Sequence, residues 1–413
     1  MIRHSQQRGQ ALALSLGFIA ALALAFSFVL VAGQAAFDKL RLTNIADAAA
    51  LSAATWEARS LNMEAALNRA MIANEAAIAQ SISLRSWSGY LDRLLPNMNL
   101  VLRFVPYLGA ATQGLERVWH GIDRVTQPSL RAAENVASAI DQEFSATAEL
   151  LHLSAPFTAR ALATAAIDAG EIRARLTRGG EASLDADALS WARLSTRYTG
   201  AARARQADLI SRSTDAFTRQ RNNRFAILPA GPVVRLERRG GTDLLGFDTW
   251  RAADTQSLHL RRFVIFGGWR ERVPLGWAAA QGGRDDPRAG WHGGSAVLNP
   301  AATRAAMAVL ARNPGYRGIP GLRDVSTPQL RIDPEHRLAL RLTSQGVPDV
   351  AQIADAAASV RYRRAQTRPD HATERGTLFE PYWEARLAPL RAVDRAAADA
   401  LDNISAARRG LPL

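Results

Sequence analysis

The chain has no cysteine, which excludes disulfide bonds, thiol catalysis, iron–sulfur ligation and cysteine-type zinc sites. Its single lysine, Lys39, lies outside any glycine-rich loop, so the sequence has no Walker-type phosphate-binding motif. Neither glycine nor proline occurs between Gln34 and Ser88, and the first proline is Pro96. Such a stretch, rich in Ala, Leu, Glu and Arg, predicts one long helix.

The basic balance of the chain comes almost wholly from arginine. The formal net charge is +13 over 413 residues, which suggests attraction to phospholipid headgroups or cell-wall polymers. Nucleic acid is an alternative anionic partner if the body faces the cytosol. No nucleic-acid recognition motif accompanies the charge, so we do not expect nucleic-acid binding.

One apolar run near the N-terminus is long enough to cross a bilayer. Residues 11–33 carry no charged side chain and would span roughly 34 Å as a helix. Arg3 and Arg8 precede the run and are expected to stay in the cytoplasm, which would place the body in the periplasm. The alternative is a cleaved secretory signal, whose apolar core is usually shorter, at about 7 to 15 residues. The predicted membrane anchor includes Ala11, Leu12, Leu16, Phe18, Leu24, Phe28, Leu30 and Gly33.

Apolar residues recur along the helix predicted beyond the membrane. Their spacings of four, four, seven and four residues place them on one stripe. We expect this stripe to pack against the protein's own later helices, and a seam for a partner helix is the alternative. The residues are Met63, Leu67, Met71, Ile78 and Ile82.

The region from 96 to 224 is predicted to be mostly helical, with breaks near Pro128, Pro156 and the Gly179–Gly180 pair. Its last part is strongly basic and is expected to be a solvated helical face. A surface that meets lipid headgroups or an acidic partner is the alternative. The basic residues are Arg193, Arg197, Arg203, Arg205, Arg212, Arg219, Arg221 and Arg224.

Residues 225–389 show the alternating apolar and polar pattern that is typical of β-strands. Strands are predicted through Leu258, Leu260 and residues 263–266, through Leu338, Leu340 and Leu342, and through Val360 and Tyr362. Four tryptophans, Trp250, Trp269, Trp277 and Trp291, are expected to fill a β core, with ligand binding as the alternative. A helical tail is predicted over residues 390–413.

Three segments carry a resemblance to a known family. In the first segment, a basic residue and a glycine directly precede the apolar run: Arg8-Gly9-Gln10-Ala11-Leu12. The second segment is rich in alanine and follows the run: Asn44-Ile45-Ala46-Asp47-Ala48-Ala49-Ala50-Leu51. A softer third segment is Phe379-Glu380-Pro381-Tyr382-Trp383-Glu384-Ala385-Arg386-Leu387. Together they resemble the TadE/TadG-like proteins of the Tad (Flp) pilus assembly system.

This resemblance implies a structural role in assembling, anchoring or capping a Tad-type pilus or a related secretion apparatus. Its implied partners are other pilus-assembly or pseudopilin-like proteins, contacted by helix packing, and inner-membrane lipid. Small side chains around Asp47 and Leu51 would let neighbouring helices approach closely.

Two features depart from the family pattern. Pseudopilins cleaved by prepilin peptidase have glutamate at the fifth position after the cleaved glycine, and counted from Gly9 that position is Leu14. An anchored assembly factor is therefore expected rather than a processed pilin. The Asp-x-Ser-x-Ser metal signature of some larger members is not reproduced by Asp324-Val325-Ser326-Thr327-Pro328.

Catalytic motifs are weak. The segment from Gly293 to Val297 fails the nucleophile-elbow pattern at its last position. His259, His292 and His336 could meet Asp285 or Asp286 only if the fold brought them together. We therefore expect no enzyme activity, no cofactor, no metal and no small-molecule substrate; a membrane-tethered envelope hydrolase or ligand-binding protein is the main alternative.

The predicted fold is α+β with a pilin-like architecture, in which a transmembrane helix continues into a long periplasmic helix. The expected divisions are a cytoplasmic tail (1–10), the transmembrane helix (11–33), a helical stalk (34–95), a helical region (96–224), a strand-rich region (225–389) and a helical tail (390–413). A single-pass inner-membrane protein with its body in the periplasm is the expected location.

Overall fold

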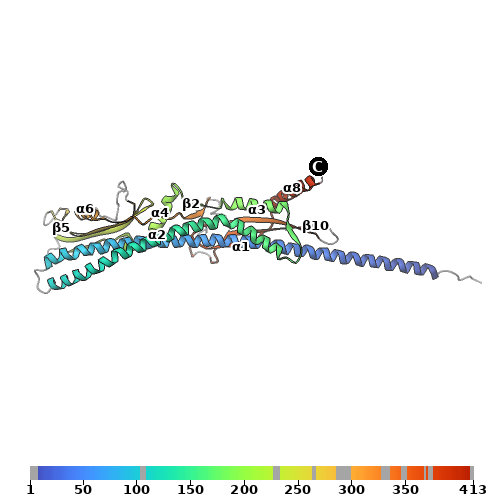
Figure 1. Ribbon diagram of the computed structural model, residues 1–413, viewed down its shortest axis with the longest axis horizontal. Helices are drawn as coiled ribbons and strands as arrows, with labels where there is room; N and C mark the ends of the chain where they lie inside the picture. The colour runs from blue at the N-terminus through green and yellow to red at the C-terminus, as the bar shows by residue number, and fades with distance from the viewer. Residues whose placement is uncertain are drawn as a thin grey trace, which may run out of the picture. The chain divides into compact units, whose positions relative to one another are not determined.

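A computed structural model gives the architecture of the chain (Figure 1). It describes residues 8–102, 108–226, 233–262, 267–284, 299–326, 335–345, 351–366, 369–370 and 375–409. The protein is a mixed α+β structure with a long apolar N-terminal helix, as predicted. It divides into two compact units that are interleaved in sequence. Unit 1 comprises residues 1–65, 150–196 and 325–413, and unit 2 comprises residues 66–149 and 197–324.

Two long helices contribute to both units. Helix α1 (Arg8–Leu102) is 95 residues long and α2 (Leu108–Asp168) is 61 residues long. Pro96 lies inside α1, and α2 continues through Pro128 and Pro156, so the predicted breaks at these two prolines are wrong. A proline leaves the carbonyl four residues earlier without its helical donor. At Pro156 this carbonyl belongs to His152, and it accepts a hydrogen bond of 2.9 Å from the Trp191 indole instead.

Unit 1 contains a four-stranded antiparallel sheet in the order β1-β9-β10-β11. Helix α3 follows β1 and runs beside β9, where the Thr177 amide donates to the Arg341 carbonyl. The predicted alternation in β9 is confirmed, because Leu338, Leu340 and Leu342 are all buried. The elements are β1 (Ala174–Leu176), α3 (Arg178–Trp191), β9 (Glu335–Gln345), β10 (Ala351–Tyr362), β11 (Trp383–Leu387) and α8 (Ala392–Arg409).

Small side chains dominate the contact between α1 and the sheet of unit 1. The buried core joins an alanine-rich face of α1 to alternate residues of β10 and to one face of α2. Alanine on both surfaces allows the helix backbone and the strands to approach closely. The residues are Ala46, Ala49, Ala50, Ala53 and Ala54 on α1, Ala354, Ala356 and Ala358 on β10, and Ala155, Ala159 and Ala163 on α2.

Unit 2 contains a five-stranded sheet in the order β3-β4-β5-β6-β7, antiparallel except for the β6–β7 pair. Its elements are α4 (Ala202–Ser213), α5 (Ala216–Arg219), β3 (Asn223–Ala226), β4 (Val234–Leu245), β5 (Thr249–Arg261), β6 (Trp269–Gly283), α6 (Pro300–Ala308) and β7 (Ala311–Asn313). The short strands β2 (Ser195–Arg197) and β8 (Arg323–Val325) form a separate two-stranded sheet. The predicted strand residues Leu258 and Leu260 lie in β5 and Val360 and Tyr362 in β10, whereas residues 263–266 lie outside the described part of the chain.

Unit 2 uses the same small-residue packing as unit 1. Strand β6 presents glycine or alanine at alternate positions toward α1. A methyl group added at Gly282 would meet Ile82, and one added at Gly276 would meet Leu94 and Tyr90. The contact is therefore tight enough that the strand carries almost no side chain where the helix crosses it.

Helix α3 begins at the glycine pair that was predicted to break a helix. Thr177 caps it by accepting a hydrogen bond of 3.0 Å from the Gly180 amide, and both glycines are buried. Their lack of a side chain allows the first turn to lie directly on β9 and α8.

Gly180→Ala is expected to lower the free energy of unfolding by about 1–3 kcal/mol, because the new methyl group would overlap the Arg341 carbonyl oxygen. Gly121→Ala in α2 is the control, since nothing lies within 4 Å of its added methyl group. That control should leave stability unchanged or raise it by up to about 1 kcal/mol. Thermal unfolding of the two variants in the same detergent measures the difference, and equal midpoints would refute the close approach.

Candidate functional site

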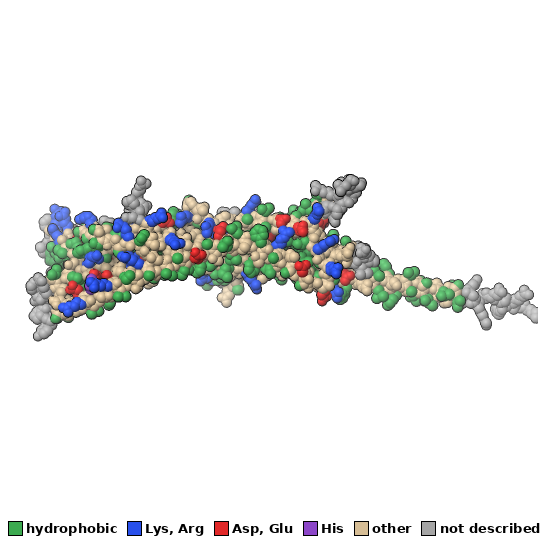
Figure 2. Space-filling view, in the orientation of Figure 1, with side chains coloured by type: hydrophobic (Ala, Val, Ile, Leu, Met, Phe, Trp, Pro, Cys, Tyr) green, Lys and Arg blue, Asp and Glu red, His purple; other side chains and the backbone are tan. Residues whose placement is uncertain are grey.

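Residues 12–34 of α1 are exposed in the part of the chain that the structure describes. Leu16 is 59% exposed, Leu24 is 72% exposed and Phe28 is 75% exposed. Figure 2 shows this projecting part of the helix covered by hydrophobic side chains and free of charged ones. The segment is long and apolar enough to cross a membrane. Leu12, Phe18, Leu30 and Gly33 are likewise exposed, whereas Arg3 and the side chains of Arg8 and Ala11 lie outside the described part.

Helix α2 is also long and apolar enough to cross a membrane, although it is less apolar than α1 and 28% of its most apolar part is buried. The sequence analysis considered only the N-terminal run. Because α2 supplies buried residues to the cores of both units, its apolar character has a role in packing.

Contacts with unit 1 begin directly after the apolar segment. The Gln352 side chain donates a hydrogen bond of 3.0 Å to the Ala35 carbonyl, and the Lys39 ammonium donates to the Ile353 carbonyl. Arg41 lies over the Phe37 ring and pairs with Glu171 at 3.5 Å. The polar residues that follow Gly33 therefore bind the start of β10 and the loop after α2.

The predicted packing stripe on α1 is divided between different environments. Met71, Ile78 and Ile82 are buried, Leu67 is half-buried, and Met63 is 54% exposed. Each four-residue step advances a helix by about 40° beyond a full turn, so Met63 lies roughly 80° from Met71 and leaves the buried face. Asp47 and Leu51 are half-buried, and burial raises the pKa of Asp47.

The buried face of α1 carries carboxylates and an amide that the apolar pattern did not predict. Glu57, Glu64, Asn68 and Glu75 are all fully buried. Their spacings of seven, four and seven residues place them on the same face as the core alanines. Burial of this many polar groups is costly unless each one has a partner.

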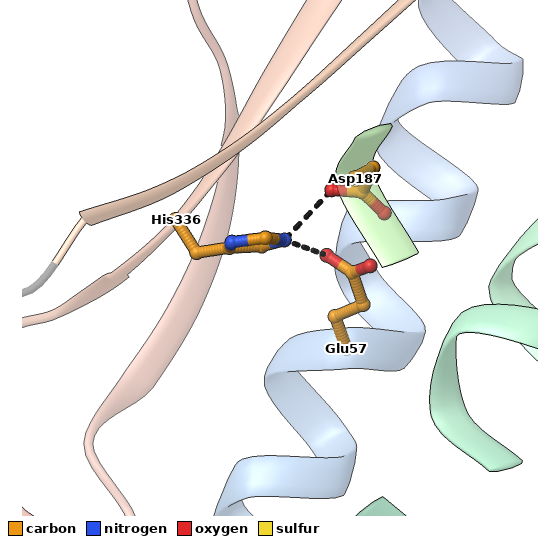
Figure 3. Close-up of side chains that lie close together, drawn as sticks. All are labelled: Glu57, Asp187 and His336. Atoms are coloured by element: carbon orange, nitrogen blue, oxygen red, sulfur yellow. Dashed lines mark ion pairs between the residues drawn. The ribbon is translucent and has the colours of Figure 1, made fainter. Parts of the chain in front are cut away.

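Glu57 belongs to a three-residue cluster in unit 1 that joins α1, α3 and β9 (Figure 3). The His336 Nε2 atom lies 2.7 Å from Asp187 Oδ1 and 3.6 Å from Glu57 Oε2. One atom from each residue lies within 4.8 Å of the other two, which is a spacing that can hold a metal ion. His336 occupies an inward position of β9, in register with the buried Leu338 and Leu340.

The polar atoms of this cluster lack ordinary hydrogen bonds. Neither carboxylate oxygen of Glu57 has a hydrogen-bond partner among the described residues, and the same holds for Asp187 Oδ1 and His336 Nε2. The 2.7 Å separation between Asp187 and His336 therefore brings two polar atoms together without a well-aligned N–H···O bond. Burial and the neighbouring Asp187 carboxylate raise the pKa of Glu57 well above its usual range.

Aromatic rings hold the histidine in place. The Trp191 ring lies 5.5 Å from His336 in an edge-on arrangement and 5.5 Å from His152 in a stacked one. His336 Nδ1 lies 3.2 Å from the Ser190 hydroxyl. His152 forms a second carboxylate–imidazole pair, with its Nδ1 atom 3.1 Å from Glu64. Unit 1 thus contains two buried histidines, each facing a glutamate of α1.

A cavity of about 630 Å³ reaches the cluster from the side of α3 and α8. Asp187 and His336 contribute to its wall, together with Ser190 and the arginines Arg193, Arg337 and Arg391. The cavity lies in unit 1 and is not lined by the tryptophans that the sequence analysis considered for ligand binding. Of these, Trp250 is buried against Glu75, and Trp269 lies 4.0 Å from the Arg235 guanidinium in unit 2.

Two other polar residues highlighted by the sequence, His259 and Asp324, have partners in the structure. His259 is buried and lies 2.7 Å from the Asn299 side chain. Asp285, Asp286, Trp291, His292 and the segment from Gly293 to Val297 lie outside the described part. In the weak metal signature, Asp324 accepts a hydrogen bond from the Tyr198 hydroxyl.

The arginine-rich segment is not a uniformly solvated face. Arg221 is buried and pairs with Asp254 at 2.8 Å, which corrects the expectation for this residue. Arg197 pairs with Glu149 and Arg224 with Glu237. Arg212 pairs with Asp208 on the surface of α4.

Two buried carboxylates of unit 2, Glu134 and Glu75, have partners of different kinds. Glu134 pairs with the Arg85 guanidinium at 2.8 Å, so its charge is balanced. Glu75 instead accepts hydrogen bonds from the Trp250 indole at 2.8 Å and the Tyr316 hydroxyl at 2.9 Å. Burial raises the pKa of Glu75 to about 8 and that of Asp141 to about 7.

The chain matches no protein-family model, no curated protein and no solved structure at a significant level of similarity.

The raised pKa of Glu75 predicts that the stability of the folded protein falls as the pH rises from about 4.5 to about 8. The unfolded chain releases this proton near pH 4.5, whereas the folded protein keeps it to about pH 8. Stability therefore falls as the pH rises between these values, by about 1.4 kcal/mol for each unit of pKa difference. Thermal unfolding between pH 5 and 8.5 should show a declining midpoint.

Glu75→Gln should make this decline shallower, because glutamine accepts the same two hydrogen bonds and has no proton to lose. The raised pKa of Asp141 should leave part of the decline in place. Glu143→Gln on the exposed side of α2 is the matched control and should keep the full pH dependence. If Glu75→Gln declines as steeply as the wild-type protein, Glu75 is not the group that titrates.

Proposed function

We propose that the protein is a membrane-anchored structural or assembly component of a Tad (Flp)-type pilus or a related secretion apparatus. The observation that supports this most directly is the continuity of α1, which runs without a break from an apolar, membrane-length segment into the core of a folded body. In this proposal the anchor lies in the inner membrane and the body in the periplasm, as the short basic leader and the TadE/TadG-like segments suggest.

The position of α1 in the core of the body supports a structural role rather than a catalytic one. From Leu42 onward one face of α1 is buried in the folded units, so the anchor and the body share one continuous helix. A flexible tether, as expected for a membrane-bound enzyme that searches for substrate, would need a polar or glycine-rich linker at this point.

Helix α2 supports the proposed packing with other subunits. Its outer side in unit 2 exposes Leu115, Val118, Ile122 and Val125, of which Val118 is 61% and Val125 is 67% exposed. Spacings of three, four and three residues are those with which one helix packs against another. A partner seam on α1 was the alternative interpretation of its apolar stripe, whereas the exposed pattern described here lies on α2.

A ligand-binding role is the second candidate, and the cavity beside Asp187 and His336 is the observation that favours it. It requires a defined ligand for unit 1, whereas assembly requires only a partner helix and lipid. A nucleic-acid role receives less support, because several arginines of the 193–224 segment pair with carboxylates of the protein itself.

Charges placed in the middle of the apolar segment should release the protein from the membrane. Leu24→Arg combined with Phe28→Arg would cost about 2.5–3.5 kcal/mol per residue in lipid and should move the protein to the soluble fraction. Leu24→Ile with Phe28→Leu is the control and should stay in the membrane fraction.

The orientation of the chain is tested by a reporter fused to the C-terminus of the wild-type protein. An alkaline-phosphatase fusion should be active, because this enzyme is active in the periplasm. Activity of a cytoplasmic reporter at the same position, with an inactive alkaline-phosphatase fusion, would refute the orientation.

Partner binding through α2 is tested by co-purification from native membranes in mild detergent. Recovery of pilus-assembly proteins with the wild-type chain is expected, and Val118→Glu with Ile122→Glu should reduce it at least about tenfold, since two buried contacts would each acquire a charge. Glu143→Gln is again the control. Equal recovery with both variants would exclude the α2 face, and recovery of no pilus-assembly protein would argue against the proposed function itself.

A further inference from the structure

We propose that Glu57, Asp187 and His336 form a binding site for a divalent transition-metal ion of the Zn²⁺ class in unit 1. This inference is independent of membrane anchoring and pilus assembly. It concerns three side chains that lie far apart in sequence and are brought together by α1, α3 and β9 (Figure 3).

The ligand geometry suits a small divalent ion. A metal with ligand bonds of about 2.0–2.1 Å separates neighbouring ligand atoms by about 2.8–3.0 Å in octahedral geometry and about 3.3–3.4 Å in tetrahedral geometry. The separations of 2.7 Å and 3.6 Å from His336 Nε2 to the two carboxylates lie on either side of these ranges. Imidazole and carboxylate ligands together favour Zn²⁺, Fe²⁺ or Mn²⁺ over softer ions.

The second nitrogen of the histidine is already engaged. His336 Nδ1 lies 3.2 Å from the Ser190 hydroxyl, so the tautomer with hydrogen on Nδ1 can donate there and leave the Nε2 lone pair for a metal. Histidines that bind metals usually have their other nitrogen fixed in this way. The Trp191 ring, 5.5 Å away, restricts rotation of the imidazole.

Neither carboxylate of the cluster has an arginine or lysine partner among the described residues. Glu134 has Arg85 and Asp254 has Arg221, whereas the ion pairs of Glu57 and Asp187 in the described structure involve His336 alone. Both oxygens of Glu57 are buried without a hydrogen-bond donor among the described residues. Two carboxylates and a neutral imidazole would compensate one divalent ion fully, at a place where isolated charges are costly.

The site lies beside a cavity. Asp187 and His336 line the cavity of about 630 Å³, while Glu57 closes the site from α1. Three protein ligands beside a cavity leave a coordination position for water or for a ligand with a donor oxygen or nitrogen. This arrangement differs from a closed structural site with four protein ligands.

The experiment uses the full chain, purified in mild detergent, stripped with a chelator and titrated with Zn²⁺ alone by calorimetry and thermal unfolding. One equivalent should bind, and saturating Zn²⁺ should raise the unfolding midpoint by about 5 °C or more. Glu57→Gln and His336→Gln should each weaken binding at least about a hundredfold and abolish the shift. Co²⁺ should give visible absorption bands in the wild-type protein that both variants lack.

Glu64→Gln is the matched control, because it removes a buried carboxylate that also faces a histidine of unit 1 but leaves the three ligands intact. It should retain one equivalent of Zn²⁺ and the thermal shift. If the wild-type protein binds no Zn²⁺, or if Glu57→Gln and Glu64→Gln bind it equally, the site is refuted. Should either ligand variant fail to fold, Asp187→Asn supplies the same comparison, with the Co²⁺ spectrum as readout.

Discussion

The close approach of α1 to the strands beneath it is the constraint on which both units depend. A helix can lie this near a sheet only where the facing side chains are small, and the two units meet this need with alternating alanines on β10 and with glycine and alanine on β6. Close contact gains dispersion energy from backbone and methyl groups rather than from large apolar side chains. It also leaves little room for error, because any added methyl group at Gly276 or Gly282 meets a side chain of α1.

A helix so tightly covered must also satisfy the polar side chains that it buries. Glu64, Asn68, Glu75 and Arg85 each have a partner from another element of their own unit. Such networks contribute little net stability compared with an apolar core, yet they penalise any shift of the helix along its axis, because the donors and acceptors would then fall out of register. The polar face of α1 therefore specifies which residue of the helix lies against which strand.

The sequence predicted the elements better than the site. Absence of glycine and proline between Gln34 and Ser88 was enough to predict a long helix, and the alternation of Leu338, Leu340 and Leu342 was enough for β9. The helix breaks predicted at Pro128 and Pro156 were wrong. At Pro156 the carbonyl that loses its helical donor accepts a hydrogen bond from the Trp191 indole, which comes from a distant segment of the chain. Glu57 and Asp187 were missed because local pattern assigns carboxylates to the surface, and His336 was noticed without its partners. The periodicity of the sequence could have predicted the burial of these glutamates, because Glu57, Glu64 and Glu75 lie on the same face of the helix as the core alanines.

The unbroken passage of α1 from its apolar segment into unit 1 has a mechanical consequence. Tension applied to the apolar end would be transmitted along the hydrogen-bonded helix axis, because α1 is continuous there and has no flexible linker that could extend first. To pull the helix out of unit 1, the load would have to shear the alanine contacts with β10 and the Glu57 and Glu64 clusters together rather than one at a time. In the proposed anchor, the folded body would therefore be the end that carries the load.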